Sequence, residues 1–360
     1  MRRSLVAFGL ATSVVLSSFT ITSANAATAP AISGGGSSFQ ANFEAACRQA
    51  YNATSATQVS YDGTLGSGTG MTNFKNATTD FAGTDGPDLT KVPTGQTAVV
   101  VPISAAPIAV IYKVKTAKGK VIKGLRLNAG LISNIYTGSV KYWDDKSIKK
   151  ANPSIAKSLP HVKIVPMVRA AGSGTTKNLT GYLAALVPTV GWVATKDFVA
   201  SANPTHAAAL ANITQQANSD AMVAGVGSTN GAIGYADLPD TLGSAKFQIA
   251  SVKNNKGQFI RATAASGSKF VNGVGAALYA NGFVGGSNAT RMFQMRISGA
   301  YPITAITYVQ ASATTSDKNA AVRDYVQYAI SSCQGKAGFS RLSGAALVIA
   351  QLQVAKIGAS

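Results

Sequence analysis

Three clusters of Gly, Ser and Thr each stand directly before an amphipathic helical pattern, at residues 33–39, 62–70 and 171–176. Short apolar runs of strand type alternate with these helical patterns. The runs are QVSYD at 58–62, DFAGTD at 80–85, AVVVPISAAPIAVIY at 98–112, KIVPMV at 163–168 and GAIGYADL at 231–238. Strands that alternate with helices are typical of an α/β fold with mostly parallel sheets flanked by helices. Because the chain has 360 residues, we expect this fold to be divided between two domains.

The first 26 residues have the pattern of a signal peptide. The basic start MRR precedes the apolar stretch LVAFGLATSVVLSSF, and Ala24-Asn25-Ala26 forms a small-residue cleavage site. A membrane anchor is the alternative, but Ser and Thr interrupt the apolar stretch. No cysteine stands near the cleavage site to carry a lipid, and no later segment has the ~18 uninterrupted apolar residues of a spanning helix. We therefore expect a soluble, exported protein, either periplasmic or secreted.

The chain has two cysteines, near opposite ends. Cys47 lies on the apolar face of the helical pattern that follows the first cluster, and Cys333 ends a similar face near the C-terminus. In an oxidising compartment a disulfide between these two helices is plausible, and two separate buried thiols are the alternative. The disulfide would require both ends of the chain to share one lobe.

The ionisable residues argue against an enzyme. The net charge is +19, and the acidic residues are one glutamate, Glu44, and twelve aspartates. The two histidines, His161 and His206, stand in loop-like contexts beside prolines. Neither a phosphate-binding GxxxxGK[ST] loop nor a GxSxG nucleophile elbow is present. We therefore expect no catalytic residue, no metal and no cofactor.

Glycine- and serine-rich loops that open helices are suited to binding an anion. The first N–H groups of a helix lack internal partners and, with the helix dipole, attract negative charge. Arg169, at the end of the strand-like run 163–168, would add a permanent charge and two parallel donors. Asp85 would accept a hydrogen bond from a protonated oxyanion such as phosphate, whereas sulfate has no proton to give. A surface ion pair for Arg169 and a turn-capping role for Asp85 are the alternatives.

Seven segments resemble, in order, the phosphate-binding proteins of bacterial phosphate ABC transporters. They are GGGSSF, GTLGSGTG, DFAGTD, IYTGSVKYWDDKSIKKANPSI, VRAAGSGTT, STNGAIGYADL and YPITAITYV. The resemblance covers most of the chain and implies a type II-like periplasmic binding protein fold, with phosphate held in a cleft between two lobes. The ligand residues that it implies are Ser38, Phe39, Ser67, Asp85, Arg169, Ser173, Gly174 and Thr175.

Position 171 departs from the family pattern. Members of the family have Asp two residues after the arginine, whereas this chain has Ala171. That aspartate would orient the arginine and partly neutralise it. Its loss leaves Arg169 more cationic, which puts phosphate selectivity and affinity in doubt but not the anion site itself.

By analogy with the family, lobe I would consist of residues 27–104 and 299–360, and lobe II of residues 105–298. Lobe II has 22 Lys and Arg against 6 Asp, a net charge of +16, whereas lobe I has a net charge of +1. The basic residues are dense in YKVKTAKGKVIKGLR at 112–126, where a Lys-Gly turn predicts an exposed hairpin, and in KSIKK at 146–150. A solvated basic face is one interpretation, and docking on an anionic cell-envelope polymer, lipid headgroups or nucleic acid is the other.

The sequence thus favours a monomeric solute-binding protein that delivers inorganic phosphate to the membrane subunits of an ABC permease. A secreted phosphate-binding or surface-attachment protein without a transporter is the alternative, because the chain is basic and has no lipid-anchor cysteine. A phosphoesterase is disfavoured by the missing metal ligands and nucleophile–base pair. Arsenate remains a possible ligand, since it protonates much as phosphate does.

Overall fold

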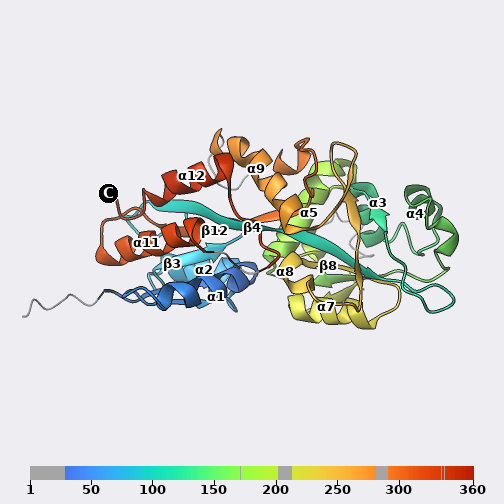
Figure 1. Ribbon diagram of the computed structural model, residues 1–360, viewed down its shortest axis with the longest axis horizontal. Helices are drawn as coiled ribbons and strands as arrows, with labels where there is room; N and C mark the ends of the chain where they lie inside the picture. Colours follow the sequence, from blue (N-terminus) through green and yellow to red (C-terminus); the bar gives the residue numbers. More distant parts are fainter. Residues whose placement is uncertain (1–28, 171, 202–212, 281–290, 334, 336) are drawn as a thin grey trace, which may run out of the picture.

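The computed structural model describes residues 29–170, 172–201, 213–280, 291–333, 335 and 337–360. These residues form two lobes that lie side by side along the longest axis of the molecule (Figure 1). The predicted signal peptide at 1–26, Ala171 and His206 lie outside the described residues.

Lobe I is built on three short parallel strands that each end in a Gly/Ser-rich or acidic turn. The strands are β1 (Ile32–Gly36), β2 (Val59–Asp62) and β3 (Phe81–Thr84), in the order β2-β1-β3. Its helices are α1 (Ser38–Asn52), α2 (Gly66–Lys75), α11 (Asp317–Ser331) and α12 (Gly344–Val354). Two of the three Gly/Ser/Thr clusters therefore lie where the sequence predicts, at the strand-to-helix turns β1–α1 and β2–α2.

A single long strand, β4 (Ala98–Lys113), runs through both lobes and is buried along nearly its whole length (Figure 1). Its first part, up to Pro107, pairs antiparallel with β12 (Thr304–Ser312), and its second part, from Ile108, pairs antiparallel with β8 (Ala232–Asp237). The uninterrupted apolar sequence allows this, because both faces of the strand are covered.

Lobe II contains the remaining described strands and most of the helices. Its strands are β5 (Arg126–Leu127), β6 (Val165–Arg169), β7 (Thr214–Gln216), β8, β9 (Gln248–Ile249), β10 (Ser251–Lys253) and β11 (Phe259–Arg261). The helices between β4 and β12 in the chain are α3 (Ala129–Tyr136), α4 (Lys146–Ala151), α5 (Gly174–Leu186), α7 (Ser219–Ser228), α8 (Leu238–Thr241) and α9 (Ala264–Ala280). Of these, α9 packs against α12 of lobe I, where Asn272 Nδ2 donates to the Ser343 hydroxyl at 2.5 Å. Four 3₁₀ turns follow the chain at Ala156–Ser158, Pro188–Val190, Val199–Ser201 and Met292–Gln294.

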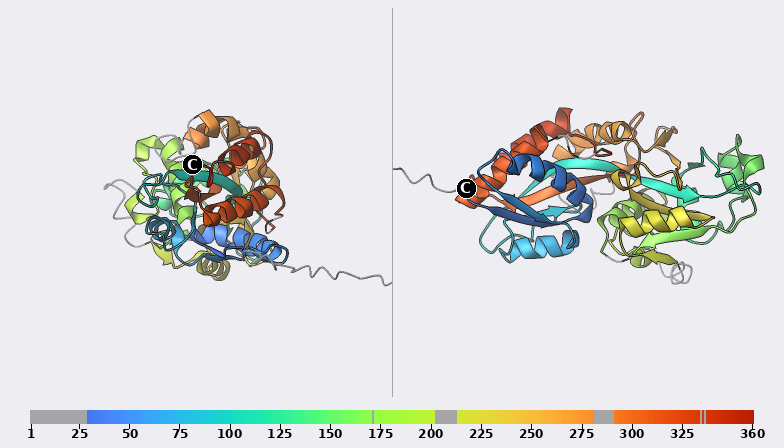
Figure 2. Two further views of the ribbon diagram at one scale, coloured as in Figure 1. Left: turned by 90° about the vertical axis from the view of Figure 1, so that its left-hand side faces the viewer. Right: turned by 60° about the horizontal axis from the view of Figure 1, so that its bottom comes forward.

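The α/β fold is confirmed, and its sheet is mixed. Nine strands of the described chain form one sheet, in which β2-β1-β3-β12-β4-β8-β6-β7 are neighbours in that order and β9 pairs with β4. Within each lobe the neighbours β1, β2, β3 and β6, β7, β8 pair in parallel. The crossing strands pair antiparallel because the chain enters lobe II on β4 and returns on β12 in the opposite direction. Figure 2 shows helices on both sides of this sheet.

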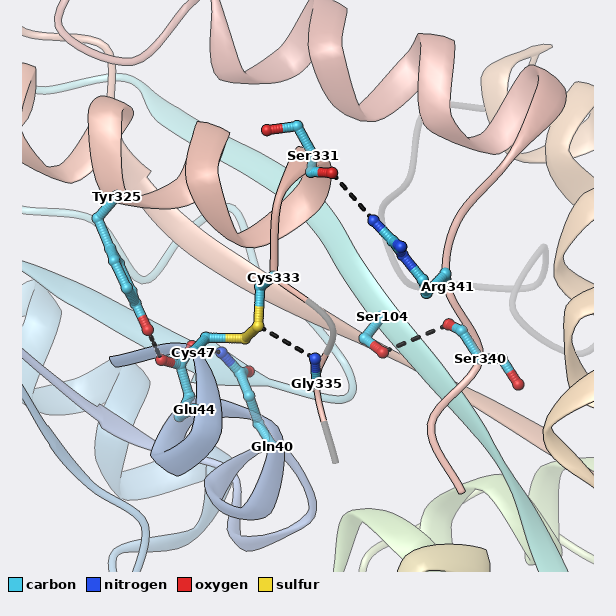
Figure 3. The surroundings of a disulfide bond; sticks show 10 residues. All are labelled: Gln40, Glu44, Cys47, Ser104, Tyr325, Ser331, Cys333, Gly335, Ser340 and Arg341. Atoms are coloured by element: carbon cyan, nitrogen blue, oxygen red, sulfur yellow. Dashed lines mark hydrogen bonds between the residues drawn. A yellow bond between two sulfur atoms is a disulfide. The ribbon is translucent and has the colours of Figure 1, made fainter. Parts of the chain in front are cut away.

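A disulfide joins Cys47 of α1 to Cys333, which follows α11 (Figure 3). The prediction of this bond is confirmed, and it ties the first described helix to the C-terminal part of the same lobe. Beside it, Glu44 is buried and accepts hydrogen bonds from the Tyr325 hydroxyl and from Gln40 Nε2 at 2.7 Å. Burial raises the pKa of Glu44, against the effect of these two donors.

The predicted basic hairpin is present at the start of lobe II. Lys115 and Val121 form an antiparallel bridge, and the Thr116 N–H donates to the Lys120 carbonyl at 2.8 Å. Gly119 occupies the turn with φ +77°, a conformation that favours glycine. Lys118 and Lys120 are exposed on this hairpin.

Candidate functional site

Asp85 stands at the carboxyl end of β3, where three loops of lobe I meet. Ser37, the N-cap of α1, donates from its hydroxyl to Asp85 Oδ2 at 2.6 Å. The Asp85 N–H donates to the Ser67 hydroxyl at 3.3 Å, which brings in the first turn of α2. The two glycine-rich turns of lobe I thus converge on one carboxyl group.

The Asp85 side chain is buried but incompletely bonded. It is 9% exposed, and its Oδ1 atom has no hydrogen-bond partner among the described residues. Burial raises the pKa of Asp85, while the hydroxyls of Ser37 and Thr307 and the positive charges of Lys196 and Lys177 act to lower it. A buried carboxyl oxygen without a donor suits a ligand that carries a proton.

Arg169 ends β6 in lobe II, at the edge where the carboxyl ends of parallel strands meet. Its backbone N–H donates to the Tyr235 hydroxyl at 3.0 Å, and its Nη1 donates to the Ser219 hydroxyl at 2.9 Å. The residue is 9% exposed, yet Nε has no partner among the described residues. Because the Arg169 fork is held at one end and unsatisfied at the other, it retains donors for an anion.

The third Gly/Ser/Thr cluster opens α5. Ser173 is the N-cap, and its hydroxyl accepts from the Thr176 N–H at 3.2 Å. The N–H groups of Gly174 and Thr175 precede the first internal hydrogen bonds of the helix, so they are available to an oxyanion. The loop therefore caps a helix, and its role in anion binding stays a prediction.

Thr175 connects the helix to a second buried carboxyl group, Asp237, which ends β8. The Thr175 hydroxyl lies 3.1 and 3.0 Å from the two carboxyl oxygens of Asp237. Burial raises the pKa of Asp237 well above its usual value, and the negative charges of Asp240 and Asp85 add to this rise. The positive charge of Arg169 acts in the opposite direction. Burial thus makes the ionised form of Asp237 less favourable than that of an exposed aspartate.

The two lobes touch at this point. A Cβ atom added at Gly174 would overlap Asp85 Oδ2 and would stand 3.1 Å from Asp85 Cγ. Only glycine fits, because the N-terminus of α5 in lobe II lies directly against the carboxyl group from lobe I. Acceptor and donors thus come from different lobes and meet across the boundary between them.

The structure brings together most of the predicted ligand residues. Ser67, Asp85 and Gly174 are linked by the contacts above, and Ser173 and Thr175 flank Gly174. Arg169 lies within electrostatic range of Asp237, with which Thr175 bonds.

The first loop differs in detail from the prediction. Ser38 is the exposed first residue of α1, and its neighbour Ser37 makes the bond to Asp85. The Phe39 ring is buried 5.5 Å from the Phe339 ring. The ring therefore packs in the core of lobe I, which leaves the backbone N–H of Phe39 as its group for a ligand.

Four residues near the site were not predicted: Ser37, Lys177, Lys196 and Asp237. Ser37 is one residue from a predicted ligand, and Lys177 follows the third cluster directly. Asp237 stands near the end of the apolar run 231–238 and is the last residue of β8, much as Asp85 directly follows β3. An acidic residue at the carboxyl end of a buried strand was therefore a usable signal for both carboxyls. Lys196 has no such signal, since it reaches the site only through the packing of its loop.

The described residues outside the site offer no competing centre. They contain no group of three or more His, Cys, Asp and Glu that would hold a metal ion. His161 is exposed, stacks on Tyr142 with ring centroids 4.3 Å apart and contacts Asp144 at 3.1 Å. Among the described residues, no helix combines the length and apolar character needed to cross a bilayer.

Relatives of the chain are named as phosphate-binding proteins. One from Methanocaldococcus jannaschii, phosphate-binding protein PstS, is 27% identical over 294 residues, which covers 77% of this chain and 72% of that protein. Another, with the same name, from Xylella fastidiosa strain Temecula1, is 28% identical over 299 residues, which covers 79% of this chain and 73% of that protein. These names are those of binding proteins, which supports the prediction that the chain is not an enzyme.

Solved structures share the fold at lower sequence identity. A high affinity periplasmic phosphate-binding protein (PfluDING) bound with phosphate superposes with a TM-score of 0.67 at 20% identity, over 91% of this chain and 93% of that one. An ABC-type phosphate transport receptor from Vibrio cholerae superposes with a TM-score of 0.53 at 14% identity, over 84% of this chain and 94% of that one. The family model of the PBP superfamily domain matches residues 22–332. The chain belongs to the PBP superfamily.

Proposed function

We propose that this protein binds inorganic phosphate between its lobes and delivers it to an ABC permease for uptake. The observation that carries the proposal is the contact between Asp85 of lobe I and the N-terminus of α5 in lobe II, with the unsatisfied Arg169 on the same side. The names of the relatives support phosphate as the ligand.

In the proposed complex, hydrogen-bond donors of the protein replace the water molecules around the phosphate oxygens. Arg169, Ser173, Gly174 and Thr175 donate from lobe II. From lobe I come the Ser67 hydroxyl and the first turn of α1, at Ser38 and Phe39. Asp85 accepts a hydrogen bond from the hydroxyl group that phosphate carries near neutral pH, and a fully ionised sulfate would meet repulsion from the same carboxyl group. Arsenate, which protonates similarly, would be accepted.

Closure of the lobes supplies the desolvation that this binding needs. We propose the boundaries 27–104 and 299–360 for lobe I and 105–298 for lobe II, so that the chain crosses at β4 and again just before β12. The second boundary follows α9 in the chain, although α9 packs on lobe I, since its Gly275 lies against Ala345 and Ala346 at the start of α12. Small rotations at the two crossings would open the site for exchange with solvent.

The proposed location follows from the first residues of the chain. Cleavage after Ala26 would release a monomeric protein into the periplasm or the medium, where the Cys47–Cys333 disulfide persists. A protein that acts without a transporter is not favoured, since the similar structures include one described as a transport receptor.

Calorimetric titration of the mature protein, stripped of phosphate, with phosphate, arsenate and then sulfate at fixed pH and salt tests the proposal. We expect tight binding of phosphate and arsenate and none of sulfate. Comparable, weak and salt-sensitive binding of all three would overturn it, because it would mean that the basic surface attracts anions generally.

We further propose that the basic end of lobe II contacts an anionic cell-envelope polymer. The exposed Lys118, Lys120 and Lys123 of the hairpin region support this, because they form a concentrated positive charge. Retention on an immobilised anionic polymer should fall when these three lysines are changed to Gln. It should persist when Lys75, Lys91 and Lys356 of lobe I are changed instead. Equal elution of all three proteins at low salt would contradict this partner.

A further inference from the structure

Two lysines of lobe II reach across the boundary and lie on lobe I beside Asp85. Lys177 is in the first turn of α5, and its Cε atom lies 3.2 Å from the place where a Cβ on Gly86 would stand. Lys196 Nζ lies 3.5 Å from the corresponding place on Gly68. Gly86 follows Asp85 directly, so both lysines end at the loops that hold the lobe I carboxyl group.

Both lysines are attached to α5, the helix whose N-terminus forms the lobe II side of the site. Lys177 is part of this helix, and hydrogen bonds join the loop of Lys196 to it. The Ser173 N–H donates to the Lys196 carbonyl at 3.1 Å. The Thr180 hydroxyl of α5 bonds the Thr195 carbonyl and accepts from the Thr195 N–H, each at 3.1 Å. Because loop and helix are bound in this way, the two ammonium groups move with the Ser173–Thr175 donors when the lobes open or close.

The two ammonium groups are partly desolvated and have no ion-pair partner. Burial lowers the pKa of both lysines, and for Lys196 the nearby charge of Lys177 lowers it further. The carboxylates of Asp85 and Asp88 act in the opposite direction, yet among the described residues neither lysine lies within 4.0 Å of a carboxylate oxygen. Two cations held near each other, and away from full hydration, are suited to a multiply charged anion.

The charges of the site require such cations. Asp85 brings a carboxyl group to the site from lobe I, and Arg169 brings one fixed positive charge from lobe II. Phosphate carries more than one negative charge at neutral pH. Without further cations, its binding would leave an excess of negative charge in a buried space.

We propose that Lys177 and Lys196 are affinity-determining residues of the anion site, which close over bound phosphate from lobe II and supply the positive charge that balances it. This inference rests on the proposed function and extends its ligand set by two residues. The lysines act only in the closed arrangement, because only then do they reach Gly86 and Gly68. We therefore expect them to slow the release of the ligand more than they speed its capture.

The test replaces each lysine by methionine, which keeps the length of the side chain and removes its charge. For Lys177→Met and Lys196→Met we expect phosphate to bind about tenfold more weakly, with the change mainly in the dissociation rate. The double variant should lose more than either single one. The melting temperature of the ligand-free protein should change little, which separates a role in charge from a role in packing.

Lys150→Met provides the matched control, because Lys150 is exposed on α4, at the end of lobe II away from lobe I (Figure 1). Its phosphate affinity should stay within twofold of the wild type. If Lys177→Met and Lys196→Met also stay within twofold, this inference is wrong while the proposed function stands. If the wild type binds no phosphate at all, both are wrong.

Discussion

The two lobes differ in charge far more than in architecture. Both consist of parallel strands covered by helices, and both present a carboxyl group at the end of a strand, Asp85 after β3 and Asp237 in β8. Residues 105–298 have a net charge of +16, however, whereas residues 27–104 and 299–360 together have +1. The two lobes therefore share an α/β framework and differ in the charged side chains that each of them carries.

Lobe I holds its acceptor in a rigid setting. The disulfide, the buried Glu44 and the aromatic contacts of Tyr325 with Tyr51 and Phe81 tie its two chain segments together. Lobe II instead supplies cations and helix N–H donors. A fixed carboxyl group opposed by donors on the other lobe makes ligand binding depend on closure, since neither lobe alone surrounds an anion.

Removal of the Arg169 charge should have the largest effect on the donor side. For Arg169→Met we expect phosphate affinity to fall roughly a thousandfold, about 4 kcal/mol, because a buried charge that contacts an anion is lost. Calorimetry measures this change. Arg261→Met removes an exposed lobe II charge and should leave affinity nearly unchanged. Equal affinities of the two variants would contradict the place of Arg169 in the site.

Loss of the disulfide should instead affect the stability of lobe I. For the double variant Cys47→Ser and Cys333→Ser, which are 286 positions apart, we expect the free energy of unfolding to fall by about 3 kcal/mol. Urea unfolding under oxidising conditions measures this. Phosphate affinity at low temperature should stay close to that of the wild type, because neither cysteine is among the proposed ligand residues. A large loss of affinity in the folded variant would show that the lobes are less independent than their charges suggest.

The contact between the lobes is tested at Gly174. For Gly174→Ala we expect phosphate binding to weaken about 30-fold, or about 2 kcal/mol, because the added methyl group overlaps Asp85 Oδ2 and prevents full closure. Gly130→Ala, in α3, is the control, since a Cβ there has no neighbour nearer than 3.4 Å. Unchanged affinity in Gly174→Ala would mean that the ligand is bound with the lobes apart.

The site residues that belong to short contiguous motifs were predictable from the sequence. The site residues that are placed by contacts between distant segments were not. Ser173, Gly174 and Thr175 form a contiguous motif, and Arg169 and Asp85 each end an apolar run. Such signals depend only on the chain nearby, and they also predicted the strand-to-helix turns of the fold.

Residues placed by packing between distant segments were missed. Lys196 reaches the site because its loop bonds Ser173, and Ser37 bonds Asp85 because it is the N-cap of α1. The antiparallel pairing of β4 with β12 has the same origin, since it follows from the return of the chain across the lobes. Each of these features depends on contacts between residues far apart in the sequence.

The buried carboxyl groups predict a pH dependence of the ligand-free protein. Asp237 has a raised pKa, so the folded state binds a proton more tightly than the unfolded state does. Stability should therefore be fully present at acidic pH, below the unfolded pKa, and should fall as pH rises through the folded pKa, by up to about 1.4 kcal/mol per pH unit. Asp237→Asn should flatten this dependence in urea unfolding, and the exposed Asp220→Asn should not.

Glu44 should respond in the same direction in lobe I, because burial raises its pKa as well. Glu44→Gln should therefore also flatten the pH dependence, independently of Asp237→Asn. A wild-type protein whose stability rises steadily from pH 5 to pH 8 would contradict both assignments.

The smallest expected effect concerns the field of lobe II at a distance from the site. Lys118, Lys120 and Lys123 are exposed, so their charges act on phosphate only through solvent. For the triple change to Gln we expect the association rate of phosphate to fall about threefold at low salt, with the dissociation rate unchanged. Stopped-flow mixing at low salt and in about 0.5 M NaCl measures both rates. The high salt should abolish the difference in association rate between the variant and the wild type. A reduced rate that persists in high salt would mean that the hairpin contributes to the site directly. The hairpin lysines would then act on phosphate in the same way as Lys177 and Lys196, by contact and not through solvent.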